Sequence, residues 1–358
     1  MKKSLIAFAV LGAFASVASA QSSVVLYGIV DLNTTYLSNQ TTTGGKKMSM
    51  DSSGLSSSRW GFKGSEDLGN GLKANFQLES SLNADSGTAG SLFDRIATVG
   101  LSGSLGTVNA GRQTNLAYDT LIQVDPIGVA HVGTNPNIVF GALNNTSLYG
   151  PFGTSVGASS ATRQNNSIKY AAPSVLGGIV FSGMYGFGEK AGDAQASSYM
   201  GTSATFSEGG LTAVFSYSQL RDATSNVTLR AYTGGAKFVV NKDVVDGLTL
   251  KVTYAENEVN TTGRNIGVFG LGADFAVTPA TTLTTGYYNT RRSGDVKGKV
   301  DTFVVLGKYA FSKRTAAYAS FTYAKAGSAL AKDTDIGLIM GAGNRSGVRT
   351  SFGVNHAF

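Results

Sequence analysis

The side chains of this chain that could do chemistry include basic residues set at alternate positions of strand-like segments. Arg59 and Lys63 flank the aromatic pair Trp60 and Phe62 in one such segment. Neighbouring side chains of a β-strand point to opposite faces, so Arg59 and Lys63 belong to the face away from both rings. Fixed charges on the wall of a confined, water-filled space act electrostatically, because they concentrate ions of opposite sign. Either residue could instead be a solvated charge, which is ordinary on a wet strand face.

A second pair of basic residues follows the same rule further along the chain. Arg163 and Lys169 share one parity, whereas Ile168 and Tyr170 share the other. We expect the two basic side chains to lie on one polar face and the two apolar side chains on the opposite face.

The sequence offers little for covalent or metal chemistry. It contains no Cys and two His, which excludes a thiol nucleophile and a thiolate metal site. No Ser-His-acid arrangement or cluster of metal ligands is recognisable, so we expect no enzyme, no cofactor and no metal. The net charge of +7 comes without a basic run or a nucleic-acid motif, and no nucleic-acid partner is expected. His131 could titrate near neutral pH, although an isolated loop histidine is more often only solvated.

Strand-like alternation predicts the elements that carry the charges. Residues 72–82 place five residues on an apolar face and five on a polar face, the latter being Lys73, Asn75, Gln77, Glu79 and Ser81. The final segment places Val348, Phe352, Val354 and Phe358 on one face and Arg349, Ser351 and Asn355 on the other. A period of two indicates strands. A solvated β-sandwich would also alternate, but it would not need this many long strands in series.

The terminal Phe358 is informative because soluble chains usually end in frayed, polar segments. A transmembrane barrel needs its last strand to pair with its first, so that no open edge faces lipid. We therefore expect Phe358 to take part in barrel closure, with its ring in an aromatic girdle.

The N-terminal end of the chain has the pattern of an export signal. Met1, Lys2 and Lys3 form a basic start, an apolar stretch runs from Leu5 to Val17, and small residues follow. This pattern predicts a cleaved signal peptide over residues 1–20 and one barrel domain over residues 21–358. An ordinary N-terminal helix is the alternative. Removing the signal takes away two Lys and no acid, so 27 basic minus 22 acidic residues leave +5.

Turn-forming residues set the number of strands. Short polar or Gly-rich connections occur at seven places: residues 66–71, 102–106, 173–178, 207–210, 241–247, 277–281 and 312–315. Longer polar connections, such as 188–198, 292–299 and 325–345, lie between them. Seven short turns with both termini on one side give eight hairpins, and so an all-β, 16-stranded antiparallel transmembrane barrel. A barrel of that size encloses water.

One connection is much longer than the rest. It runs from residue 114 to about residue 162 after the fifth strand, and a connection of this length is usually functional. Its scattered apolar residues favour burial: Leu121, Ile122, Ile127, Val139 and Phe140. If this connection folds back into the lumen, these residues are buried. A mobile external loop is the alternative.

Two acids in this connection could face the basic residues. Asp119 and Asp125 are candidates for lining a constriction. Each could instead form a local turn, since Asp before Pro126 is a turn signal.

Four stretches of the chain resemble the general porins of beta-proteobacteria. They are Gln21–Asp31, Ser58–Ala74, Phe311–Thr315 and Val354–Phe358. The resemblance implies a homotrimer of 16-stranded barrels in the bacterial outer membrane, each with a pore narrowed by an inward-folded third outer loop. The Pro-Glu-Phe-Gly-Gly loop signature of enteric porins is missing, and Val124–Gly128 stands in its place.

The resemblance also implies roles for single residues. It favours an inward Arg95, in one basic wall with Arg59 and Arg163, although parity alone leaves Arg95 undecided. Arg112 has outward parity, and in similar porins an Arg after this strand pairs with a neighbouring subunit; a solvated rim charge is the alternative. Phe358 would be read by the outer-membrane assembly machinery.

These observations predict a porin for passive diffusion of small hydrophilic solutes and ions, with a preference for anions. Outer-membrane lipid and lipopolysaccharide are its expected surroundings. Three other functions remain open: a solute-specific channel for an anionic nutrient, an outer-membrane hydrolase, and an adhesive or structural barrel. The hydrolase would need a catalytic constellation, and the adhesive barrel would show no conductance.

Overall fold

The computed structural model describes residues 23–130, 135–139, 162–175, 177–260, 262–294, 297–330, 333, 336–341 and 343–358. The predicted signal peptide, residues 1–20, lies outside the described residues, as does His131.

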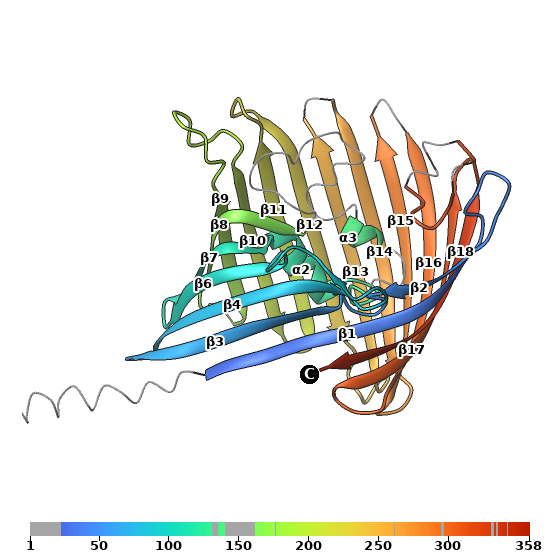
Figure 1. The fold of residues 1–358 in the computed structure, drawn as a ribbon, viewed down its shortest axis with the longest axis horizontal. Coiled ribbons are helices and arrows are strands. Elements are labelled where there is room, and N and C mark those ends of the chain that lie inside the picture. The colour runs from blue at the N-terminus through green and yellow to red at the C-terminus, as the bar shows by residue number, and fades with distance from the viewer. Residues whose placement is uncertain are drawn as a thin grey trace, which may run out of the picture.

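Strands make up most of the described chain (Figure 1). They are β1 (Ser23–Leu37), β2 (Lys47–Ser52), β3 (Arg59–Gly69), β4 (Leu72–Asn83), β5 (Thr88–Ala89), β6 (Ile96–Gly103), β7 (Gly106–Thr114), β8 (Arg163–Ala171), β9 (Ile179–Gly186), β10 (Tyr199–Glu208), β11 (Leu211–Arg221), β12 (Val227–Val239), β13 (Leu248–Val259), β14 (Arg264–Ala276), β15 (Thr281–Ser293), β16 (Gly298–Ala310), β17 (Thr315–Ala326) and β18 (Ser346–Ala357). Of these 18, the short β2 and β5 belong to connections, which leaves 16 barrel strands, as predicted. All of the strand pairings are antiparallel.

The barrel is closed by its first and last strands. β1 pairs with β18 from Ile29 opposite Ala357 to Leu37 opposite Arg349. Beyond the strand, Phe358 exchanges two backbone hydrogen bonds with Gly28, each 3.1 Å long. A Cβ on residue 28 would lie 2.4 Å from Cζ of Phe358, so glycine is needed where the terminal ring lies over β1. The predicted closure is confirmed.

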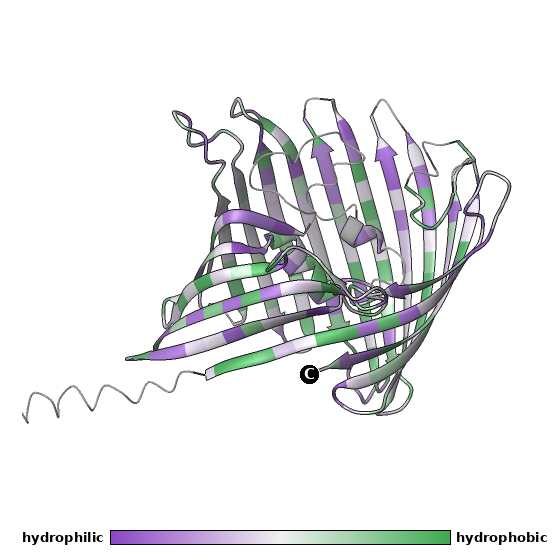
Figure 2. Cartoon of the chain, viewed as in Figure 1, coloured by the Kyte–Doolittle hydropathy of each residue, from purple (hydrophilic) through white to green (hydrophobic). Residues whose placement is uncertain are grey.

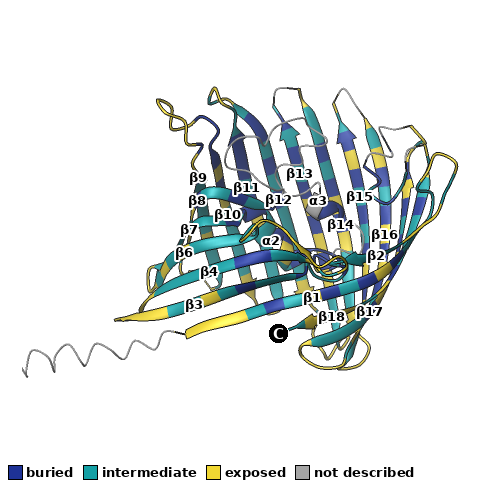
Figure 3. Ribbon diagram, viewed as in Figure 1, coloured by how far each residue is buried: buried dark blue, intermediate teal, exposed yellow. Residues whose placement is uncertain are grey.

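Alternation separates the outer surface of the barrel from the lumen. On β13, Leu250, Val252 and Tyr254 are exposed, whereas Lys251 and Thr253 point inward and are buried. The same alternation of apolar and polar residues recurs on most strands (Figure 2), and so does the alternation of burial (Figure 3). An apolar outer band with a polar interior suits a barrel surrounded by hydrocarbon.

The seven predicted short turns are all present, at the end of the barrel that carries Phe358. One of the longer connections is shorter than predicted. β15 continues to Ser293 and β16 begins at Gly298, so the predicted connection 292–299 shrinks to residues 294–297. The prediction failed because polar residues on the lipid-border end of a strand resemble a loop in sequence.

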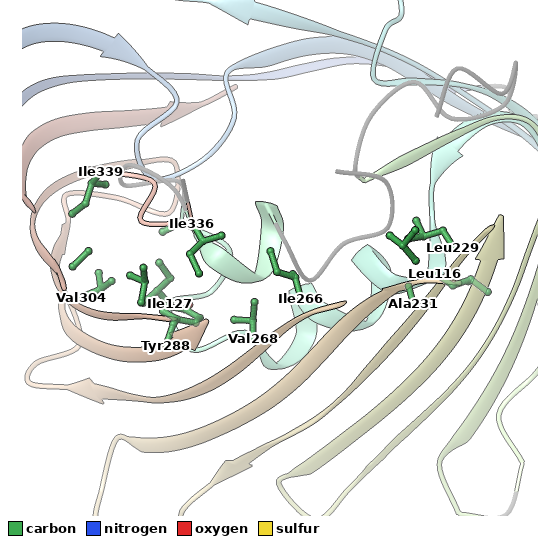
Figure 4. Packing of buried hydrophobic residues seen from close by; sticks show 14 of the residues in the cluster. Leu116, Ile127, Leu229, Ala231, Ile266, Val268, Tyr288, Val304, Ile336 and Ile339 are labelled. Atoms are coloured by element: carbon green, nitrogen blue, oxygen red, sulfur yellow. The ribbon is translucent and has the colours of Figure 1, made fainter. Parts of the chain in front are cut away.

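The apolar core lies inside the barrel. Helices α2 (Leu116–Val124) and α3 (Pro136–Val139) follow β7, and α2 packs against the inner wall formed by β10, β11 and β12. Buried residues of this segment, such as Leu116 and Ile127, meet Leu229, Ile266 and Val304 of the wall (Figure 4). Ile336 and Ile339, from the connection between β17 and β18, join the same cluster, so that connection also folds inward.

The long connection therefore folds back into the lumen in its described part, and the alternative of a mobile external loop is wrong there. Leu121 and Ile127 are buried as expected. Ile122 is 44% exposed, because it lies on the side of α2 away from the wall. The Val139 side chain and Phe140 lie outside the described residues. No helix in the described ranges is long and apolar enough to cross a membrane.

Candidate functional site

Two of the predicted arginines meet at one carboxylate on the lumen wall. Nε of Arg95 lies 2.6 Å from Oε1 of Glu79, and Nε of Arg59 lies 3.5 Å from Oε2 of the same residue. Glu79 shares the inward parity of Gln77 on β4, and Arg59 shares that of Lys63 on β3. One carboxylate thus holds two guanidinium groups.

The third arginine joins the same group through backbone. Nε of Arg163 donates to the carbonyl oxygen of Arg95 at 2.9 Å, and Nη1 donates to Oγ1 of Thr162 at 3.0 Å. The structure therefore brings Arg59, Arg95 and Arg163 together, as the resemblance implied. Three arginines against the single acid Glu79 give this group a formal charge of +2.

Counting alternate positions along β8 is a poorer guide to the position of Arg163 than its contacts are. Asn166 has a φ of 49°, and the β7–β8 register shifts between Gly111 and Gln113. Such a bulge interrupts the two-residue period. Arg163 and Lys169 therefore lie on different sides of an irregularity that the sequence pattern did not indicate.

Lys63 continues the basic wall toward the end of the barrel that carries the short turns. Its Nζ lies 5.1 Å from the centroid of the Tyr27 ring, and the Tyr27 hydroxyl donates to Oε2 of Glu79 at 3.0 Å. Lys63 also lines a lumen recess of about 460 Å³ with polar residues that include Gln77, Thr98 and Asn109. Glu79 and Tyr27 were missed as functional candidates, although Glu79 stands on the polar parity of β4.

Asp119 lies in the first turn of α2, near the start of the inward-folded segment, and forms an ion pair with a lysine. Its Oδ2 lies 2.6 Å from Nζ of Lys169, and its Oδ1 accepts a hydrogen bond from the Thr114 hydroxyl. Asn115 caps α2 by accepting from the backbone N–H of Tyr118, and an acid in the first helical turn is favourable. Asp119 remains partly exposed, and both of its carboxylate oxygens have partners within the chain.

Asp125 has a different place from the one predicted. Only 1% of it is exposed, so a constriction-lining position is not what the structure gives it. Its carboxylate accepts hydrogen bonds from N of Ile127 (3.1 Å), N of Val129 (2.9 Å), Nδ2 of Asn135 (2.8 Å), Nδ2 of Asn137 (3.0 Å) and the hydroxyl of Tyr288 (3.3 Å). Burial raises the pKa of Asp125, and the hydrogen bonds oppose that rise. Asp125 thus organises the tip of the segment and ties it to β15, because its oxygens have their donors inside the protein.

Glycines on the inner wall make room for this tip. A Cβ on Gly272 would lie 2.6 Å from Cβ of Pro126, and one on Gly286 would lie 2.6 Å from Cγ2 of Ile127. Nζ of Lys251 donates to the carbonyl oxygen of Pro126 at 3.3 Å and pairs with Asp274. Inward-parity glycines on neighbouring strands were a signal for this contact that the sequence analysis did not use.

Arg112 makes contacts within its own chain. It lies opposite Ala97 at the β7 irregularity, and its Nε donates to the carbonyl oxygen of Asp94. Its Nη1 donates to Oδ1 of Asn165. These partners do not support the alternative of a solvated rim charge.

Comparison with known proteins fits this architecture. A model of the family described as Gram-negative porin matches residues 7–328. The chain belongs to the Gram-negative porin family. It is similar to outer membrane porin protein 32 of Delftia acidovorans, with 31% identity over 369 residues and 100% of both chains covered. It is also 33% identical over 299 residues to an outer membrane porin protein of Bordetella pertussis, a match that covers 77% of this chain and 67% of that protein.

A solved structure shares both fold and length with this porin. The anion-selective porin from Comamonas acidovorans superposes with a TM-score of 0.77 at 27% sequence identity, covering 94% of this chain and 100% of that one. The predictions of a beta-proteobacterial type of porin, a 16-stranded barrel and an outer-membrane location are confirmed. The lumen of this porin is its water-filled channel.

Proposed function

We propose that this porin passes small hydrophilic solutes by passive diffusion and prefers anions. The observation that carries the preference is the meeting of Arg59, Arg95 and Arg163 around the single acid Glu79 on one wall of the lumen. Fixed charge on a low-dielectric wall focuses its field on the water beside it, so anions are concentrated there and cations are repelled. The similar structure titled as an anion-selective porin supports the proposal.

The acids of the inward-folded segment do not offset this field. Asp119 is paired with Lys169, and Asp125 is buried among hydrogen-bond donors. A pore with unpaired acids facing its arginines would have a transverse field, whereas here the group of three arginines and Glu79 keeps a formal charge of +2. The predicted constriction set is therefore proposed as Arg59, Lys63, Arg95 and Arg163, with Asp119 as a neutralised member.

A solute-specific channel for an anionic nutrient is the second candidate. A recess of about 500 Å³ in the same lumen is lined by further basic side chains, among them Lys308 and Arg314, and by the ion pair of Lys251 with Asp274. An anion leaving the arginine wall would meet these residues next. This function requires conductance that saturates with the nutrient and is blocked by it.

We propose a homotrimer in which Arg112 braces the subunit contact, a signal peptide over residues 1–20, and recognition of Phe358 by the assembly machinery. No catalytic role is proposed.

Single-channel recording in a planar bilayer tests the function. In a KCl gradient the reversal potential should lie on the anion side and move toward zero as total salt rises, because salt screens the wall. A cation-side reversal potential would contradict the anion preference. Conductance linear in solute concentration supports general diffusion, whereas saturation would favour the second candidate.

A further inference from the structure

The outer surface of the barrel has a recess at the end away from the short turns, across β13 to β16. It measures about 490 Å³ and is lined by Tyr254, Gly267, Phe269, Tyr287, Asn289, Arg291 and Lys299. Tyr254 and Phe269 are exposed on the face of the barrel turned away from the lumen, and their neighbours Ala255 and Val268 are buried inside. The recess therefore opens toward the surroundings of the barrel and takes no part in the channel.

Glycine creates the recess. Gly267 shares the outward parity of Phe269 on β14, so a position that would otherwise carry a side chain is empty. An added Cβ there would lie 3.0 Å from the hydroxyl of Tyr254, whose ring borders the space. The part of the recess lined by Tyr254, Phe269 and Tyr287 is aromatic, and this composition suits the border between hydrocarbon and headgroups.

The rim of the recess that lies farthest from the short turns carries two basic side chains directly opposite each other. Arg291 of β15 pairs in register with Lys299 of β16, and like charges in this arrangement destabilise a sheet unless an anion separates them. Lys325 of β17 lies one strand further, opposite Asp301.

The acids near the rim neutralise it only in part: Asp301 pairs with Lys299, whereas no carboxylate in the described part of the chain forms an ion pair with Arg291 or Lys325. Asp301 lies 3.1 Å from Nζ of Lys299 and also accepts from Tyr287 and Asn289. Glu256, across the recess, accepts from Tyr254 and Asn265. Nε of Arg291 has the neutral Asn289 side chain as its acceptor at 2.8 Å.

We propose that this recess binds a phosphate-bearing lipid of the outer leaflet. The phosphate would lie between Arg291 and Lys299, and an acyl chain would follow Tyr254, Phe269 and Tyr287 over the space above Gly267. A guanidinium beside an ammonium suits the two or more free oxygens of a phosphate. Free inorganic phosphate would leave the aromatic half of the recess unfilled, which is why the lipid is the occupant.

The test measures binding of a bis-phosphorylated lipid A to the folded, detergent-extracted porin by native mass spectrometry. R291Q/K299Q should bind about 30-fold more weakly, because each basic residue near lipid headgroups contributes roughly 1 kcal/mol. The matched control is K46Q/K47Q, which removes two exposed basic charges from the connection between β1 and β3 and should bind as wild type does. Heat-modifiable gel migration checks that each variant is folded.

Two further arms separate a fitted site from a general basic surface. Gly267→Leu fills the recess without changing charge and should also weaken binding. Dephosphorylated lipid A should bind as weakly to wild type as the phosphorylated lipid binds to R291Q/K299Q, and inorganic phosphate should not displace the bound lipid. Wild-type affinity in R291Q/K299Q, equal binding of the dephosphorylated lipid, or displacement by inorganic phosphate would each overturn the proposal.

Discussion

Selectivity in this porin is an electrostatic property of a few side chains. Glu79 is the one acid in direct contact with Arg59 and Arg95 among the described residues, and it is nearly buried between them. Its charge does two things at once: it holds the guanidinium groups in place and it cancels part of their field. The balance between these effects decides how strongly the wall attracts anions.

Replacing Glu79 by Gln should therefore increase anion preference. The amide keeps an acceptor for Arg95 and removes one negative charge from the wall, so the local field becomes more positive. We expect the ratio of anion to cation permeability to rise roughly twofold or more. Reversal potentials in a KCl gradient measure this ratio, and a shift toward the cation side would contradict the assignment of Glu79 as the counter-charge.

Asp125 predicts a pH dependence of stability. Burial raises its pKa in the folded protein, so the folded state binds a proton more tightly than the unfolded chain does. Stability from this group is then greatest in acid and falls as pH rises above about 4, the ordinary value of an Asp, through the raised pKa. Asp125→Asn lacks this titration.

The unfolding midpoint of wild type relative to Asp125→Asn should therefore decline across that window. Denaturant titrations at a series of pH values measure it. Parallel pH profiles for the two proteins would mean that Asp125 titrates as an exposed carboxyl does.

At the level of elements, the inward-folded segment is held by shape as well as by hydrogen bonds. α2 packs on β11 and β12, where Oγ1 of Thr120 donates to Oγ of Ser216 at 3.2 Å. The following tip lies against wall glycines, and a larger residue at Gly272 would not fit without moving the backbone of Pro126. The channel is therefore narrowed by a segment whose position depends on the wall.

Gly272→Val should push the tip off the wall and narrow the channel further. The new side chain would overlap Pro126, and such overpacking costs about 1–3 kcal/mol, which the tip can relieve by moving into the lumen water. Single-channel conductance should fall or become noisy while the barrel still folds. The control is Gly183→Val, because a Cβ at Gly183 meets nothing within 4 Å. Unchanged conductance in Gly272→Val would show that the tip does not set the width.

Periodicity was enough to predict the strands but not the loop chemistry. β4, β13 and β18 follow strict alternation, so their inward and outward faces could be read from sequence. Arg163 could not be placed by counting, since the bulge at Asn166 breaks the period. Asp125 could not be separated from Asp119 either, because the donors around it come from loop backbone and from Tyr288, which is 163 residues away.

At the scale of the whole molecule, the pairing of β1 with β18 closes the strands into one barrel whose outer surface is mostly apolar. Arg112 interrupts that surface at the β7 irregularity, where a charge is costly unless it is paired. Its contacts with the Asp94 backbone and Asn165 satisfy part of the guanidinium. The remaining donors are available to a neighbouring subunit in the proposed trimer.

Arg112→Ala should lower the temperature at which the trimer dissociates on a native gel. Asn165→Ala is the matched variant, since it removes the partner within the chain and leaves the arginine. A larger effect of Arg112→Ala than of Asn165→Ala supports a subunit contact. Equal effects would limit Arg112 to bracing its own barrel.

In the proposed function the arginine wall sets ion preference, and the reversal potential of the triple variant R59S/R95S/R163S measures how much of that preference the three arginines supply. In a KCl gradient this variant should move toward the cation side, with the permeability ratio changed by about tenfold, while conductance persists because the lumen keeps its water. K46S/K47S, which changes charge outside the barrel wall, should behave as wild type does. A triple variant with the wild-type reversal potential would show that these three arginines do not set ion preference. The residues that select ions would then have to be other basic residues, such as Lys169 or Lys308.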